Sequence, residues 1–474
     1  MSNSVYQTLT QTLSRVGMVL STIVRALPVG TNWDVACLLF TIMSGRLLWT
    51  RGSLFPALEE VGLTEGEVRR AQASLVHGRW TTERLVSNWQ QFVLTEGRFQ
   101  VHEYEGIRPV ACDLVGFFRP RLKGCTTKHY VSEAGKALPA VVFALVGSVG
   151  SVGSVGSVGS VGSVGTVGSV GTVGRVDHRT RHLLPRLLLR QEPYETSEQD
   201  LMRRAVREAG KGLASREAFK EALITDAGFS LAMLLQEGVP WFVTRVDKNF
   251  TARRNTLPPY QGSGRRPEYG ERVRPLARKR KDHHLPATEP DERVQWQDSK
   301  RTVRAEVFEN LVLPTVRAGA DASCCFRCVV IHDPRYSEPL VLATNLNISA
   351  EALWRLYRDR WPVEKAPLAA KQMLGAQRAF VFSKEGRWRL PELALLAGNI
   401  LSYLAAGSEA VPTGFWDRAA LPTCGRLRRT LHRVHFSQLP LSDGRLRKKA
   451  SRTDHLPKGI LAHRRHKAGS FTGN

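Results

Sequence analysis

The segment Val110-Ala-Cys-Asp-Leu-Val115 places a single carboxylate inside an apolar run. Valines at both ends favour a β-strand, and an ionised side chain among such neighbours is costly unless it is paired or bound to a metal. Asp113 therefore has two interpretations. It is either a buried functional carboxylate or a residue on the exposed face of an alternating strand.

Two further strands are predicted after this one, over residues 137–146 and 183–189. Between them, glycine recurs at every third position from Gly147 to Gly174, in Gly-Ser-Val and Gly-Thr-Val triplets. Glycine-rich repeats resist a unique packed state. We interpret the repeat as an insertion in a hairpin connection, with no function of its own.

A second acidic residue follows another apolar run. Residues 198–222 are predicted to be helical and lead into Ala222-Leu-Ile-Thr-Asp226, and residues 241–246 predict a strand. Asp226 is either a functional carboxylate at the end of an element or the N-cap of a helix.

The rest of the chain divides by composition. The pattern predicts an α/β protein that begins with a helical N-terminal domain at 1–100, which either binds DNA or serves as a structural cap. The first part of a core follows at 101–250, with the repeat at 147–174. The remaining segments are a basic and β-rich insertion at 251–345, a helical end of the core at 346–410 and a basic tail at 411–474.

Charge indicates the class of partner. Lys and Arg number 68 against 43 Asp and Glu, giving a formal net charge of +25, which favours polyanions such as nucleic acid. The seven irregularly spaced cysteines are typical of a reduced, intracellular protein. No signal peptide or membrane span is predicted, so we expect no membrane partner.

A third acidic residue lies in Leu356-Tyr-Arg-Asp-Arg-Trp-Pro-Val-Glu-Lys-Ala-Pro-Leu-Ala-Ala-Lys371. On one continuous helix, Tyr357, Arg360, Glu364 and Lys371 would share a stripe. Such a stripe suits one metal-binding carboxylate with two cations and a phenol for phosphates, but a solvated face with an Arg360–Glu364 ion pair has the same spacing. Pro367 is expected to kink this helix and threatens to remove Lys371 from the stripe.

The spacing Tyr-x2-Arg-x3-Glu-x6-Lys resembles the YREK signature of the insertion-sequence-four-type DDE transposases. Thr225-Asp-Ala-Gly-Phe229, Phe242-Val-Thr-Arg-Val-Asp-Lys-Asn249 and Arg360-Trp-Pro-Val-Glu364 also resemble that family. The resemblance covers roughly residues 100–410. It implies an RNase H-like core with a β-rich insertion between the second Asp and the Glu.

The resemblance also implies roles for individual residues. Asp113, Asp226 and Glu364 would be the catalytic carboxylates and would hold Mg²⁺, for which Mn²⁺ can substitute. The implied DNA contacts are Tyr357, Arg360, Lys371 and Arg245, with Trp241 as the aromatic that holds a flipped base.

The expected function is therefore that of an insertion-sequence transposase, which cuts transposon ends and joins them to target DNA by two-metal phosphoryl transfer. Its expected partners are double-stranded DNA and a second copy of the chain, in the prokaryotic cytoplasm near the nucleoid. Two alternatives remain: a catalytically inactive relative that only binds DNA, and an RNase H-like nuclease that does not rejoin strands.

Overall fold

The computed structural model describes residues 3–448 except 120–124, 126, 132–133, 154–180, 261, 263, 281–282, 379–380, 382, 411–416, 418–420 and 442. The predicted tail at 411–474 thus lies largely outside the described residues. Six helices precede the first strand: α1 (Asn3–Val24), α2 (Thr31–Met43), α3 (Arg46–Trp49), α4 (Leu54–Glu60), α5 (Glu65–His77) and α6 (Thr82–Glu96). The expected helical character of residues 1–100 is confirmed.

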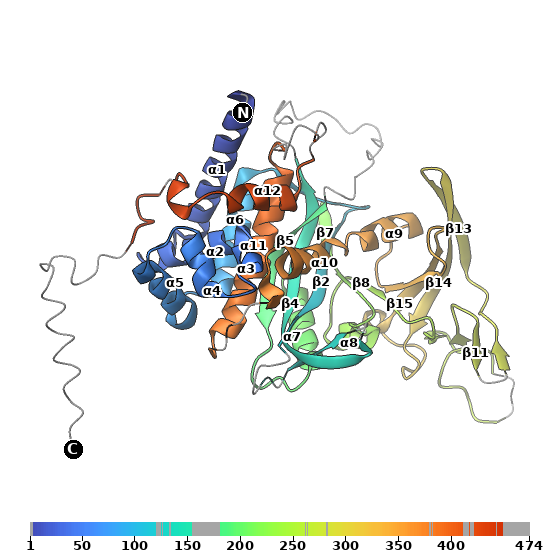
Figure 1. The fold of residues 1–474 in the computed structure, drawn as a ribbon. Coiled ribbons are helices and arrows are strands. Elements are labelled where there is room, and N and C mark those ends of the chain that lie inside the picture. The colour runs from blue at the N-terminus through green and yellow to red at the C-terminus, as the bar shows by residue number, and fades with distance from the viewer. Residues whose placement is uncertain are drawn as a thin grey trace, which may run out of the picture.

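One large mixed sheet forms the centre of the molecule, with helices on both sides (Figure 1). Its strands run in the order β1 (Phe99–Val101), β4 (Lys136–Val152), β2 (Ile107–Phe118), β7 (Phe219–Thr225), β8 (Phe242–Arg245), β16 (Leu340–Thr344), β15 (Phe326–His332), β14 (Arg301–Val312), β9 (Ala252–Arg254) and β10 (Arg272–Val273). The α/β class predicted from the sequence is confirmed.

Strand direction divides this sheet into two parts. In the first part, β4 is antiparallel to β2 and to β5 (Arg181–Arg190), while β7 is parallel to β2 and β8 is parallel to β7. From β8 onward the neighbours β16, β15 and β14 are all antiparallel. The second part therefore extends the first from its β8 edge, and all of its strands follow Asp226 in the sequence.

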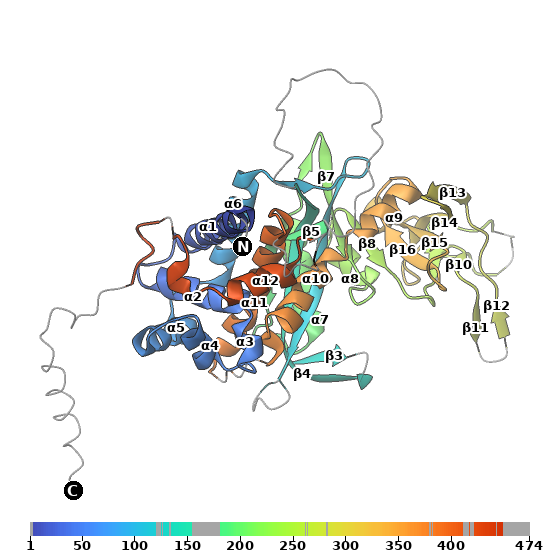
Figure 2. The same ribbon diagram turned by 45° about the horizontal axis from the view of Figure 1, so that its top comes forward.

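Short strands flank this sheet. β13 (Glu292–Asp298) pairs with β14, β3 (Lys128–Val131) with β4, and β6 (Ser215–Arg216) with β7. β11 (Arg278–Arg280) and β12 (His283–Leu285) form a separate two-stranded ribbon that projects from the end of the molecule opposite α1–α6 (Figure 2).

The two faces of the sheet carry separate hydrophobic cores. Successive side chains of a strand point to opposite faces. Ala111 and Val115 of β2 pack in the core shared with α10 (Pro362–Leu368) and α11 (Gly386–Ala406), whereas Val110 and Cys112 pack in the core shared with α7 (Glu198–Lys211) and α8 (Leu231–Gln236). By this alternation, Asp113 lies on the α10 face.

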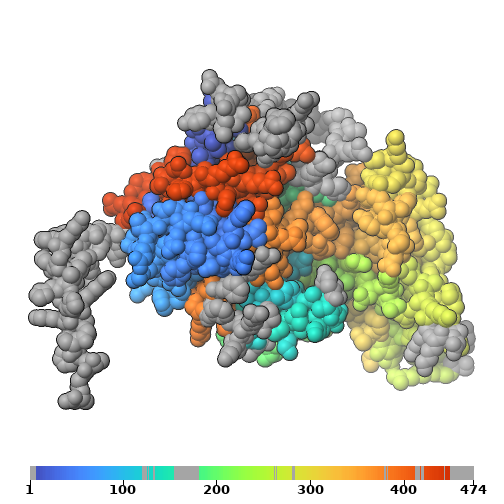
Figure 3. All heavy atoms as spheres, viewed as in Figure 1, coloured from blue at the N-terminus to red at the C-terminus, as the bar shows by residue number. Residues whose placement is uncertain are grey.

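The N-terminal helices share one core with segments from the other end of the chain. Residues of α1, α2, α5 and α6 lie in the same cluster as α11 and α12 (Cys424–His432). Buried polar contacts support the packing: the indole N–H of Trp89 donates to Asn399 at 2.8 Å, and Arg15 pairs with Glu96 at 2.9 Å. In Figure 3 the blue N-terminal and red C-terminal segments accordingly lie against each other.

The start of the glycine repeat belongs to the sheet. β4 continues through the first two triplets, and Ser151 lies opposite Arg181 in the antiparallel β4–β5 pair. A Cβ atom on Gly147 would lie 2.5 Å from the carbonyl oxygen of Leu184, and one on Gly150 would lie 2.2 Å from that of Gln100. The predicted hairpin position is confirmed, while residues 154–174 of the repeat lie outside the described residues.

The prediction of a helix over residues 198–222 is wrong in its second half. α7 ends at Lys211, with Gly212 as its C-cap, and β7 begins at Phe219. The apolar residues of β7 are buried between the parallel strands β2 and β8, so sheet pairing decides the conformation here. Across the described residues, none of the helices has the length and apolarity needed to cross a bilayer.

Candidate active site

Two of the three predicted carboxylates lie on or directly after neighbouring parallel strands. The β2–β7 pairing ends with Ala111 opposite Ile224. Asp113 lies two residues further along β2, Asp226 directly follows β7, and the charge of Asp226 acts on Asp113. The turn after β7 is fixed by Thr244, whose hydroxyl donates to the carbonyl oxygen of Asp226 at 3.2 Å.

Glu364 reaches the same place from α10. Val363 and Ala366 of this helix are buried in the core above the sheet, so the helix rests on the face to which Asp113 points. The Glu364 side chain is 35% exposed and that of Asp113 is 20% exposed, so both are accessible from solvent. We call Asp113, Asp226 and Glu364 the carboxylate site.

The single helix on which the four signature residues would share a stripe does not form. The break lies before α10, whereas Pro367, where a kink was expected, lies inside α10. α9 (Ala350–Arg358) ends before Arg360, α10 begins at Pro362, and a π-helical turn follows at Ala369–Met373. The physical reason is local: proline at the first helical position begins a new helix, and Pro367 cannot donate the hydrogen bond of a regular helix interior.

Despite these breaks, Arg360 joins the three segments. Its guanidinium lies 3.4 Å from an oxygen of Asp113 and forms an ion pair with Glu364. It also lies 6.0 Å from the ring centre of Tyr357. Burial alone would lower the pKa of Arg360, but the neighbouring phenol and carboxylates raise it by more. The net effect is a raised pKa, so this side chain stays charged. The predicted Arg360–Glu364 pair therefore forms across a turn.

The carboxylate site carries excess negative charge. The pKa of Asp113 is raised to about 7, first by burial and then by the neighbouring Asp226, with Glu364 adding to the effect and Arg360 opposing it. Lys371 contributes a second cation: burial lowers its pKa, and the charge of Asp113 partly restores it. Its ammonium lies 5.6 Å from the ring centre of Phe117, so the π turn keeps Lys371 over the sheet.

These carboxylates have the chemistry of a magnesium site. Mg²⁺ takes oxygen ligands and is commonly held by one or two protein carboxylates together with water. Within the described part of the chain, no three His, Cys, Asp or Glu side chains are close enough together to form a ready-made metal site. Arg360 instead occupies the space between Asp113 and Glu364. The donors suit a divalent cation by type, since all three are carboxylates, and burial followed by the charge of Asp226 disfavours the Asp113 anion without a cation beside it.

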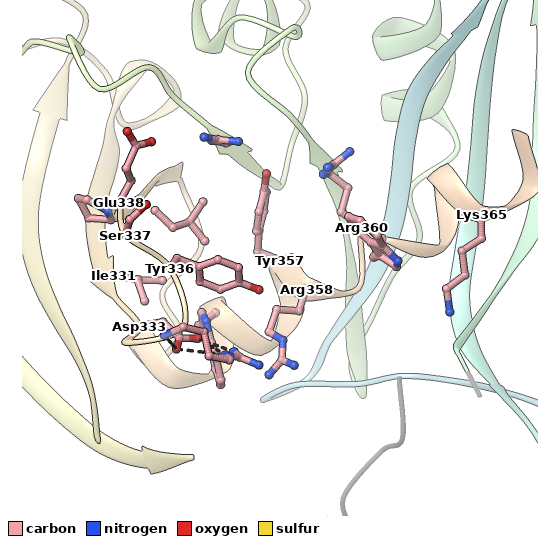
Figure 4. Close-up of a pocket in the computed structure, with 15 residues that line it drawn as sticks. Ile331, Asp333, Tyr336, Ser337, Glu338, Tyr357, Arg358, Arg360 and Lys365 are labelled. Atoms are coloured by element: carbon pink, nitrogen blue, oxygen red, sulfur yellow. Dashed lines mark hydrogen bonds and ion pairs between the residues drawn. The ribbon is translucent and has the colours of Figure 1, made fainter. Parts of the chain in front are cut away.

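A cavity of about 780 Å³ opens beside Arg360. It lies between the β15–β16 loop and the α9–α10 turn, with Tyr336, Tyr357 and Arg358 around it and Arg360 and Lys365 toward α10 (Figure 4). Its basic lining residues are Arg245, Arg335, Arg358, Arg360 and Lys365. Its aromatic lining residues are Tyr336, Trp354, Tyr357 and Trp361.

Two aromatic residues of this cavity were missed by the sequence analysis. Tyr336 and Trp361 are 64% and 58% exposed, which is unusual for large rings. Trp361 lies between Arg360 and Glu364 of the signature. This position could have indicated that its side chain belongs to the site. Tyr336 lies in a loop without any recognisable pattern.

The remaining predicted residues are divided. Arg245 lines the cavity, and Tyr357 is buried at its wall. Trp241 is not among the lining residues: its ring packs at the margin of the core that includes β7, β8 and α9, with the ammonium of Lys220 5.6 Å from its centre.

Comparisons with known proteins add no assignment to this geometry. Neither the models of known protein families nor the curated proteins include one that matches the chain.

Proposed function

We propose that this protein is a DDE-type DNA transposase, which cuts DNA at the ends of an insertion sequence and joins those ends to a target. The observation that carries the proposal is that Arg360 joins Asp113 of β2 to Glu364 of α10, while Asp226, at the end of β7, acts electrostatically on Asp113. An ordinary solvated helix face has no reason to align with two strand carboxylates.

The strand order supports an RNase H-like core. In β5-β4-β2-β7-β8, β4 is antiparallel to both of its neighbours, and β7 and β8 run parallel to β2. This is the order and direction expected of that fold. In this assignment β14, β15 and β16 are the β-rich insertion between the second Asp and the Glu.

Each residue of the site has a part in phosphoryl transfer. Bound Mg²⁺ or Mn²⁺ would supply activation of the attacking oxygen and charge stabilisation of the leaving one. Asp113, Asp226 and Glu364 would hold the ion. Arg360 and Lys371 offer cations for the phosphate that is cut.

The neighbouring cavity fits a nucleotide of the DNA substrate. Guanidinium groups match phosphate oxygens, and exposed aromatic rings provide stacking surfaces for bases. The net charge of +25 supports the same partner class. We further propose that the enzyme acts as a homodimer on double-stranded DNA, in the prokaryotic cytoplasm at the nucleoid.

One observation favours the alternative of an inactive, DNA-binding relative. Arg360 already pairs with two of the three carboxylates, and a protein that no longer loads metal would keep that arrangement. The two functions differ in whether the phosphodiester bond is cut.

A plasmid excision assay separates them. The substrate carries a marker between the DNA segments that flank this gene, and purified full-length protein is added with Mg²⁺ or Mn²⁺. We expect excised fragment with the wild type and a loss of about 10³-fold or more with Glu364→Gln, which removes one ligand charge but keeps the side-chain shape. DNA binding without excision by either protein would support the inactive relative and reject the transposase.

A further inference from the structure

A fourth carboxylate lies next to the carboxylate site, and it is completely buried. Asp359 has a side-chain exposure of 0%, although an ionised carboxylate is costly to bury without partners. It has three: Nδ1 of His102 lies 2.7 Å from Oδ2, the hydroxyl of Tyr104 donates to Oδ2 at 3.0 Å, and Nε of Arg181 lies 3.1 Å from Oδ1. We call Asp359, His102, Tyr104 and Arg181 the Asp359 cluster.

This cluster fixes the turn between α9 and α10. Asp359 is the C-cap of α9 and immediately precedes Arg360. Arg181 also donates to the carbonyl oxygen of Arg358 at 3.2 Å, so it holds the backbone as well as the carboxylate. The backbone from which Arg360 extends is therefore tied to the sheet on its N-terminal side.

The anchoring groups come from the far edge of the sheet. His102 and Tyr104 lie between β1 and β2, and Arg181 begins β5. Nε2 of His102 lies 2.7 Å from the hydroxyl of Ser151 in β4, which completes its hydrogen bonding. Neither helix propensity nor core packing requires a charged cluster here, because α9 and α10 each have their own apolar contacts.

We propose that Asp359 is a positioning residue: held by the Asp359 cluster, it sets the direction of the turn from which Arg360 reaches the carboxylate site. The catalytic part of this inference rests on the proposed function. The described side-chain partners of Arg360 are Asp113, Glu364 and Tyr357, so a rotation of the turn would change its contacts in the carboxylate site. A small rotation of the turn would move a guanidinium needed at the scissile phosphate.

A conservative pair of variants tests the idea. Tyr104→Phe removes one hydrogen bond to Asp359. Tyr403→Phe is the matched control because the Tyr403 phenol also donates to a carboxylate, that of Glu96, in the helical region away from the site. Both phenols have a raised pKa from burial and their carboxylate partner, so the two substitutions remove similar groups.

Two readouts are compared. The first is the single-turnover DNA cleavage rate at saturating metal, with DNA affinity measured separately. We expect a loss on the order of 10-fold for Tyr104→Phe at unchanged affinity, and none for Tyr403→Phe, since misplacing a group by a fraction of an ångström is enough for such a loss. The second is the ¹⁹F signal of 5-fluorotryptophan at the exposed Trp361, identified by its absence in Trp361→Phe.

The ¹⁹F signal does not depend on activity. We expect Tyr104→Phe to shift or broaden it and Tyr403→Phe to leave it unchanged. If the wild type fails to cut DNA, the proposed function fails, and the ¹⁹F signal still decides whether the Asp359 cluster sets the turn. If Tyr104→Phe only lowers thermal stability, as the control does, with the ¹⁹F signal and cleavage rate unchanged, the positioning role is refuted.

Discussion

The carboxylate site and the Asp359 cluster lie on the two sides of one turn, yet their charge balance is opposite. In the carboxylate site Arg360 pairs with only two of the three acids, and burial together with its acidic neighbours makes Asp113 hard to ionise. In the Asp359 cluster one acid has an arginine, a histidine and a phenol. The carboxylate buried in the Asp359 cluster has polar partners at both oxygens, although Oδ1 and Nε of Arg181 meet as an ion pair without a hydrogen bond. The carboxylate site, in contrast, is left short of positive charge that a metal would supply.

The largest expected difference appears when the same substitution is made on each side. Asp359→Asn leaves Arg181 buried without its counter-charge, and we expect it to lower the free energy of unfolding by roughly 3–5 kcal/mol. Asp113→Asn relieves crowding among acids, and we expect it to raise this free energy at pH 8 by roughly 1–2 kcal/mol.

Urea denaturation of metal-free protein, followed by circular dichroism, measures both changes. Equal losses of stability in the two variants would erase the distinction between the regions.

The pH dependence of stability sharpens the same comparison. Asp113 has a pKa of about 7 in the folded protein against 3.8 for an ordinary Asp, so the folded chain binds more protons between these values. Its contribution to the free energy of unfolding therefore falls as pH rises from about 4 to about 7, by roughly 1–3 kcal/mol.

This contribution is isolated by subtraction, because other groups titrate in the same range. Asp34, for example, has a pKa raised to about 6 by burial. The wild-type profile minus the Asp113→Asn profile, both measured with a chelator present, should slope downward across this window. A flat difference would show that the pKa of Asp113 is not raised in the folded protein.

Metal binding is expected to have the smallest effect. At a Mg²⁺ concentration ten times its Kd, the folded state gains about 1.4 kcal/mol, which corresponds to a rise in Tm of a few degrees. We expect this rise in the wild type and in Tyr403→Phe, and its loss in Asp113→Asn. A rise of equal size in Asp113→Asn would place the metal elsewhere, as differential scanning fluorimetry would show.

Local patterns in the sequence predicted individual strands and helices better than the way in which these elements bring the site residues together. The apolar run around Asp113 and the hairpin position of the repeat were predictable, because strand composition and glycine periodicity are local signals. The register that sets Asp113 beside Asp226 depends on long-range pairing of β2 with β7. The turn before α10 was hidden by the spacing of the signature residues, although Pro362 signalled a helix start.

The Asp359 cluster was beyond sequence reasoning for a related reason. In the sequence, nothing distinguishes Asp359 from its charged neighbours Arg358 and Arg360, and its partners lie far away in the chain. These residues stand out only because they are buried together, and no local sequence motif indicates that burial. For Tyr336 likewise, exposure in a cavity is the informative property, and it follows only from the assembled sheet.

The first two glycine triplets determine which changes in the repeat the fold can tolerate. The sheet has no room for a side chain at Gly147 or Gly150, and it uses Ser151 to hold His102. The six triplets from Gly147 to Val164 are identical, so gain or loss of a few copies during replication leaves the first two unchanged in sequence. The same six residues would therefore complete β4 across a range of repeat lengths. Variation in the number of triplets would then leave the sheet intact, whereas a single base change that replaces Gly150 would disturb it.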